Sequence, residues 1–112
     1  DLEFLPMPTW LHNHIAGILW LMLNALKIDG QSGKAALPPL NLRTKPGQYR
    51  HPDVMYLLPR HRDRFDNRVW GYADVVIEVV SEDDPDRDYI TKRDEYAEAG
   101  VPEYWIVDPV KR

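Results

Sequence analysis

The spacing of apolar residues near the start of the chain predicts a long helix. Apolar side chains recur three or four positions apart from Leu11 to Leu26, which is the spacing of an amphipathic helix of about five turns. Thr9 is a suitable N-cap residue, and Gly30 is a suitable stop. We therefore expect a helix over this segment that ends near Gly30.

Shorter apolar runs follow, and they predict strands. We expect strands at Ala35–Leu42, Pro52–Leu58, Ala73–Val80 and Pro102–Val107. Pro38-Pro39 inside the first of them marks a bulge or an edge, because proline cannot donate to a strand ladder. Ala73–Val80 is expected at the centre of the sheet, since both of its faces are apolar.

Turns and a second helix complete the pattern. Lys45-Pro46-Gly47 predicts a turn, and residues 59–67 predict a short basic helix or loop. Acidic residues before Pro85 predict the start of a helix that runs to Ala99, with Gly100 as its cap. The order α-β-β-β-α-β predicts an α/β domain with a mixed β-sheet flanked by helices.

Composition limits the class of protein. The 112 residues suit one domain, and 44% of them are hydrophobic. The chain has no cysteine, which excludes disulfides and thiolate zinc sites and favours a cytoplasmic location. The longest apolar run, Ile15 to Leu23, is too short to span a bilayer. We expect a single domain over residues 1–112 that is truncated at both ends.

Charge is unevenly distributed along the chain. The net charge of −4 argues against a protein that coats nucleic acid indiscriminately. However, Arg43–Arg68 holds seven basic and three acidic residues, whereas Asp74–Asp108 holds twelve acidic and three basic residues. A basic middle can contact phosphates while an acidic region holds a cation, although two solvated faces explain the same pattern. The candidate nucleic-acid contacts are Arg43, Arg60, Arg62 and Arg64.

Glu78 is the most unusual residue of the chain, because it lies within an apolar strand. An ionised carboxylate there is costly unless something pairs it. A second carboxylate, Asp53, lies at the start of the preceding apolar run. If the two strands pair with the matching faces aligned, the carboxylates converge. Two fixed carboxylates suit a hard cation such as Mg²⁺, which stabilises charge during phosphodiester hydrolysis.

Three residues of the second helix fall at helical spacing. Asp88, Lys92 and Tyr96 are each four positions apart, so they share one face. A lysine near the two carboxylates can neutralise charge that develops in a reaction. Tyr96 is more typical of a core or interface aromatic than of a residue that stacks on a base.

Each candidate also has a structural interpretation. Glu78 is explained equally well as a buried ion-pair partner of Arg43 or Lys92. Asp53 follows a proline and can simply begin a strand. Asp88 and Lys92 can form a surface salt bridge, which contributes about 0.3–0.5 kcal/mol.

Five stretches, spread over nearly the whole chain, share one resemblance. They are Leu5-Pro6-Met7-Pro8-Thr9 with His12, Pro52-Asp53-Val54, Ile77-Glu78-Val79-Val80-Ser81, Asp88 to Tyr96, and Gly100-Val101-Pro102-Glu103-Tyr104-Trp105-Ile106-Val107-Asp108-Pro109. Together they resemble the Uma-type family of restriction endonucleases, which belongs to the PD-(D/E)XK nuclease superfamily. The resemblance implies a restriction-endonuclease-like core and cleavage of DNA with Mg²⁺ or Mn²⁺ as cofactor.

The resemblance also implies roles for individual residues. Asp53 matches the first metal-binding aspartate and Glu78 the second acid, with the carbonyl of Val79 as a backbone ligand. Val80 occupies the usual lysine position, which is a departure from the superfamily pattern. Lys92 matches a lysine on the following helix that substitutes for it in this family. The candidates for the edge of the site are His12, which matches a family histidine, Asp88 and Tyr96.

These observations predict a metal-dependent DNA endonuclease with Asp53, Glu78 and Lys92 as catalytic residues. Cutting both strands of a duplex usually requires two copies, so a homodimer is a candidate assembly. One alternative is a non-catalytic nuclease-fold module that binds nucleic acid or a protein partner, because the lysine beside Glu78 is missing. An interaction domain whose carboxylates are structural is the third interpretation.

Overall fold

The computed structural model describes residues 10–80 and 89–109. The elements within these ranges are α1 (Trp10–Ala25), β1 (Lys27–Ile28), β2 (Gln31–Ser32), β3 (Lys34–Ala36), β4 (Asn41–Lys45), β5 (Gln48–Arg50), β6 (Val54–Leu57), the 3₁₀ helix η1 (Pro59–Arg64), β7 (Val69–Trp70), β8 (Val75–Val79), α2 (Tyr89–Glu98) and β9 (Glu103–Val107).

The main sheet has the strand order β3-β6-β8-β9. The pairs β3–β6 and β6–β8 are antiparallel, and β8–β9 is parallel, so the sheet is mixed. With the two helices, these strands follow one another as α1, β3, β6, β8, α2 and β9. This order confirms the predicted α-β-β-β-α-β core.

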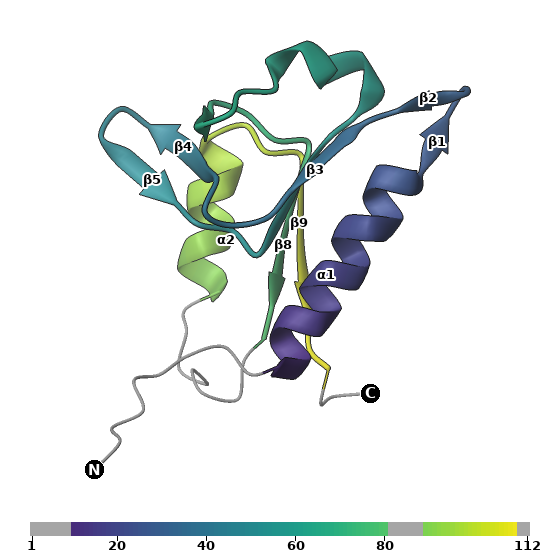
Figure 1. Cartoon of the computed structure of the whole chain (residues 1–112). Helices are drawn as coiled ribbons and strands as arrows, with labels where there is room; N and C mark the ends of the chain where they lie inside the picture. The colour runs from purple at the N-terminus through teal and green to yellow at the C-terminus, as the bar shows by residue number, and fades with distance from the viewer. Residues whose placement is uncertain (1–9, 81–88, 110–112) are drawn as a thin grey trace.

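The two faces of the main sheet are covered by different helices (Figure 1). Ala16 of α1 packs in one apolar cluster with Val54 and Ile77. Tyr96 of α2 packs in the other cluster with Met55 and Val76, together with residues of the small sheet β5-β4-β7. Successive strand residues point to opposite faces, so β8 is buried on both. The prediction of a central strand at Ala73–Val80 is confirmed.

The first helix is shorter than the sequence predicts. It ends at Ala25 rather than near Gly30, because Asp29 and Gly30 form the turn of the β1–β2 hairpin. Both turn residues have positive φ angles, 51° and 76°. Asp-Gly is a preferred sequence for a two-residue hairpin turn of this kind.

The predicted strand Ala35–Leu42 is wrong as a single element. It divides into the end of β3 and the start of β4, which belong to different sheets. Pro38-Pro39 lies at the break, where proline cannot supply the N–H groups of a ladder. The turn at Lys45-Pro46-Gly47 is confirmed, with Gly47 at a φ of 78°.

The second helix ends as predicted. Gly100 has a φ of 86°, and the N–H of Val101 donates to the carbonyl of Tyr96 at 3.0 Å, which closes the last turn. The expected cap Thr9 and the acidic start signal before Pro85 lie outside the described residues. Within the two described ranges, neither helix combines the length and apolar character that a bilayer crossing requires.

Candidate active site

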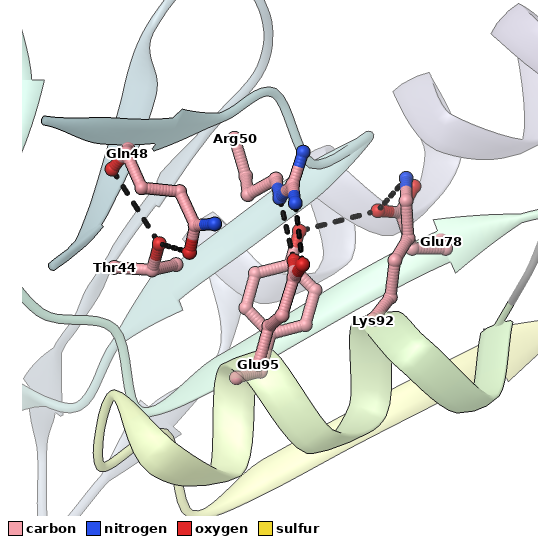
Figure 2. Close-up of polar contacts among 7 residues, drawn as sticks. Thr44, Gln48, Arg50, Glu78, Lys92 and Glu95 are labelled. Carbon is pink, nitrogen blue, oxygen red and sulfur yellow. Dashed lines mark hydrogen bonds and ion pairs between the residues drawn. The ribbon is translucent and has the colours of Figure 1, made fainter.

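Glu78 lies near the end of β8 and is fully buried. Its Oε1 atom is 3.2 Å from Nζ of Lys92 and 3.3 Å from the hydroxyl of Tyr96. Figure 2 shows Lys92 reaching from α2 to Glu78 on the neighbouring strand. The cost of burying this carboxylate is therefore offset by a cation and by a hydroxyl donor.

The connection between β8 and β9 explains why α2 meets Glu78. Parallel neighbouring strands need a crossover, which here contains α2 and lays it back on the sheet. Lys92 and Tyr96 are four residues apart and share one helical face. Both side chains contact Glu78; the pairing with Lys92 was one of the two predicted for Glu78, and a catalytic role for Lys92 stays a prediction. Asp88, the third member of the predicted face, lies outside the described residues.

Tyr96 keeps its hydroxyl proton beside Glu78. Burial raises the pKa of Tyr96 strongly, and the nearby charge of Glu78 raises the pKa further. The hydroxyl therefore remains a donor at every pH at which the fold is expected to persist. It can hold one oxygen of Glu78 in a fixed position.

Asp53 lies next to Glu78 across the strand pair. Val54 pairs with Ile77 and Met55 with Val76, which is the alignment of faces that brings the two carboxylates to the same end of the sheet. Oδ2 of Asp53 accepts a hydrogen bond of 2.7 Å from the backbone N–H of Val79. This bond fixes the carboxylate against the end of β8.

His12 approaches Asp53 from α1. Its Nε2 atom is 3.1 Å from Oδ2 of Asp53, and its side chain is buried. A cavity of about 260 Å³ opens at this contact, lined by His12, Asn13, Ala16, Leu37, Pro38 and Asp53. A space therefore adjoins Asp53 on the side of α1, and His12 lines it; the role of His12 at the edge of an active site stays a prediction.

The candidate nucleic-acid contacts lie elsewhere. Arg60, Arg62 and Arg64 are exposed on η1, which follows the last residue of β6, whereas Asp53 precedes the first. These three arginines thus lie at the opposite end of β6 from Asp53. Arg43 is exposed on β4. The structure does not bring these four arginines beside Glu78.

Two polar groups of the structure were not predicted from the sequence. Arg50 of β5 binds Glu95 of α2 through Nε at 2.6 Å and Nη2 at 2.5 Å (Figure 2). Asp74, just before β8, is buried and accepts hydrogen bonds from the N–H of Leu58 and the hydroxyl of Tyr72. The 45 positions between Arg50 and Glu95 leave no sequence signal for their pairing, whereas a carboxylate at the edge of the apolar run could have indicated Asp74.

Comparison with known proteins identifies the family. The profile of the Uma2 family, described as "Putative restriction endonuclease", matches residues 1–112. No curated protein matches the chain. A solved structure, a putative nuclease belonging to DUF820 from Anabaena variabilis, has a TM-score of 0.63 and 18% sequence identity. The match covers 97% of this chain and 63% of that protein. Similarity at this identity shows a shared fold, and the family match shows that the chain belongs to the Uma2 family.

Proposed function

We propose that this chain is a metal-dependent endonuclease that hydrolyses phosphodiester bonds of DNA, with Mg²⁺ or Mn²⁺ as cofactor. The observation that carries the proposal is the fully buried Glu78, with the ammonium of Lys92 in contact and with Asp53 opposite it in the register of β6 and β8. Membership of the Uma2 family supports a nuclease activity.

The chemistry of the available donors fits a hard cation. Asp53 and Glu78 supply carboxylate oxygens, and Val79, which follows Glu78 and donates its N–H to Asp53, adds a backbone carbonyl. Among residues 10–80 and 89–109, no group of three or more His, Cys, Asp or Glu side chains is arranged to hold a metal. Mg²⁺ needs fewer protein side chains than three, because it typically takes one or two carboxylates and retains several waters.

Each residue has a distinct task in the proposed reaction. Asp53, Glu78 and the carbonyl of Val79 would hold the cation, which supplies positive charge to the phosphate oxygens when bound. The N–H of Val79 and the hydroxyl of Tyr96 keep the two carboxylates in place. The ammonium of Lys92 offsets the charge of Glu78 and offers a proton or a hydrogen bond to the reacting groups.

The partners of the proposed enzyme follow from its substrate. DNA would contact the exposed arginines of η1 and Arg43 through its phosphates. The arginines of η1 lie one strand length from Asp53, about 14 Å for the four residues of β6 at 3.4 Å per residue, a span that a duplex covers easily. Cleavage of both strands usually requires two sites, so we propose a homodimer. Because the chain has no cysteine, we also propose a cytoplasmic location.

One observation favours a second candidate function. Val80 follows Val79 at the position where the superfamily carries lysine, and Lys92 is engaged with Glu78. If that ion pair is purely structural, the chain is a non-catalytic nuclease-fold module that binds nucleic acid or a protein partner. DNA binding without cleavage would select this function.

Nicking of supercoiled plasmid tests the proposal. The wild-type chain should nick DNA in Mg²⁺ or Mn²⁺ and not in EDTA, and Glu78→Gln should lower the rate by at least ~10³-fold, the effect of losing several kcal/mol of charge stabilisation. Glu103→Gln, the same change at an exposed strand residue, should leave the rate unchanged. Metal-independent nicking, or equal rates in the two variants, would refute it.

The same variants separate metal binding from folding. A cation that binds the native state raises the midpoint of thermal unfolding with its concentration. This rise should be present in Glu103→Gln and absent in Glu78→Gln. An unchanged Mg²⁺ dependence in Glu78→Gln would remove Glu78 from the proposed metal site.

A further inference from the structure

Arg50 differs from the other arginines of the basic middle because it lies beside the carboxylate site. Its partner Glu95 immediately precedes Tyr96, and the hydroxyl of Tyr96 contacts Glu78. Arg50 is close enough to Tyr96 for the charge of the guanidinium to oppose part of the rise in the pKa of Tyr96. Figure 2 shows the guanidinium of Arg50 on the same side of α2 as Lys92 and Glu78.

The guanidinium of Arg50 has one edge engaged and one edge open. Nε and Nη2 donate to the two carboxylate oxygens of Glu95, which uses two of the five N–H donors of an arginine. Among the described residues, Glu95 is its one hydrogen-bonding partner. The edge formed by Nη1 and the second N–H of Nη2 is therefore available, and the side chain is 34% exposed.

An open arginine edge of this kind is suited to phosphate. The planar fork matches two oxygens of one phosphate group, which a lysine cannot do. The hydrogen bonds to Glu95 raise the pKa of Arg50, so the group is charged at any relevant pH. Because Glu95 fixes the guanidinium in advance, little side-chain freedom remains to be lost when a ligand binds.

We propose that Arg50 binds the oxygens of the DNA phosphate at, or next to, the bond that is cleaved, and that Glu95 is its positioning residue. The inference rests on the proposed function and adds a substrate-contacting group to it. Arg50 would act from the α2 side of Glu78, beside Lys92, whereas the arginines of η1 would contact phosphates farther along the duplex.

Three variants separate this role from a structural one. Arg50→Gln and Glu95→Gln each break the same ion pair, and the double variant Arg50→Gln with Glu95→Gln replaces it by two neutral amides. Arg93→Gln is the matched control, because Arg93 is an exposed arginine of α2, the helix that carries Glu95. The measurements are the nicking rate in Mg²⁺, the affinity for a short duplex in Ca²⁺ as a function of salt, and the thermal midpoint.

A phosphate contact predicts that the variants diverge. Arg50→Gln should lower the nicking rate by ~10²-fold, the effect of removing one positioned charge-stabilising donor. It should also reduce the slope of log affinity against log salt by about 0.9, the value for one phosphate. Glu95→Gln keeps the charge and should retain that slope. The double variant should be as impaired as Arg50→Gln, and Arg93→Gln should behave as wild type.

A structural ion pair predicts the opposite pattern. Arg50→Gln and Glu95→Gln would then lose activity equally, and the double variant would recover part of it, which would overturn the inference. If the wild type cleaves DNA and Arg50→Gln cleaves at the same rate, the inference fails while the proposed function stands. If the wild type binds DNA without cleaving it, the proposed function fails, and an unchanged salt slope in Arg50→Gln would overturn the inference separately. If the wild type neither cleaves nor binds DNA, both fail.

Discussion

The two ends of the central strand β8 each hold a buried carboxylate, and the two are stabilised in different ways. At the first end, Asp74 accepts hydrogen bonds from the N–H of Leu58 at 2.7 Å and the hydroxyl of Tyr72 at 2.8 Å. Its Oδ1 also lies 2.8 Å from Nδ1 of His61. Leu58 directly precedes η1 and His61 belongs to it, so these hydrogen bonds attach η1 to the sheet.

At the other end, Glu78 is paired with Lys92 of α2, the helix within the crossover that joins β8 to β9. A second acidic residue, Asp53, is opposite Glu78 in the strand register, and a cavity adjoins Asp53. Asp74 thus has the surroundings of a structural residue that completes a loop. Glu78 has surroundings in which two carboxylates and a cation can act on a ligand. Burial of a carboxylate therefore does not identify a site until its partners are known.

Among the partners of the two carboxylates, the largest effect is expected at Lys92. Lys92→Met should leave metal binding intact or tighter, because the ammonium no longer opposes a cation at Glu78. It should lower the nicking rate at saturating Mg²⁺ by at least ~10²-fold, the scale of losing one proton-transfer or charge-stabilising group. Plasmid nicking by folded protein measures this.

Two further variants accompany Lys92→Met: Lys92→Arg as the conservative substitution and Lys45→Met as the surface control. Lys92→Arg retains a cation and should be less impaired, and Lys45→Met removes an exposed lysine of β4. A structural pair between Lys92 and Glu78 predicts lower stability but a near-wild-type rate per folded molecule. That result would place Glu78 in the same class as Asp74.

Substitution of Asp74 should lower the stability of the fold and leave metal binding unchanged. Asp74→Asn places an amide N–H₂ where the native residue accepts several hydrogen bonds, and the fold should lose about 2 kcal/mol of unfolding free energy. The rise of the thermal midpoint with Mg²⁺ should equal that of the wild type. Denaturant unfolding measures the loss of free energy, and thermal unfolding with and without Mg²⁺ measures the rise of the midpoint, with the exposed Asp63→Asn as control for both.

A loss of the Mg²⁺ response in Asp74→Asn at a temperature where the variant is folded would contradict the comparison. It would mean that the end of β8 near η1 contributes to the metal site.

The smallest effect is expected for the arginines of η1, at the Asp74 end. Replacing Arg60, Arg62 and Arg64 together by alanine should weaken DNA binding on every sequence alike. The slope of log affinity against log salt should fall by up to about three phosphate contacts. Fluorescence anisotropy on several duplexes measures this, with Arg93→Ala as control. Wild-type affinity in the triple variant would show that these residues form only a solvated surface.

The core of the fold could be predicted from the sequence because its signals are local. The strand around Glu78 is a continuous apolar run, and α2 ends at a glycine with positive φ, as its sequence indicates. The strands β5 and β7 were missed because two or three residues carry too little periodicity to be recognised. The β1–β2 hairpin was missed although Asp29-Gly30 is a recognisable turn sequence.

The candidate site could be predicted only as a set of residue types. The spacing of Lys92 and Tyr96 indicated one helical face, and the structure directs that face at Glu78. The contact of His12 with Asp53 and that of Arg50 with Glu95 join elements far apart in the chain. Such pairings depend on how helices pack on the sheet, which a single sequence does not specify.

The most direct test of the central claim is a crystal structure after soaking in Mn²⁺, with anomalous scattering used to locate the ion. We predict one strong peak in contact with a carboxylate oxygen of Asp53 and one of Glu78, and a displacement of Lys92 away from Oε1 of Glu78. The Glu78→Gln crystal should lack the peak. A wild-type crystal that binds Mn²⁺ only elsewhere, with Lys92 still on Glu78, would contradict the account.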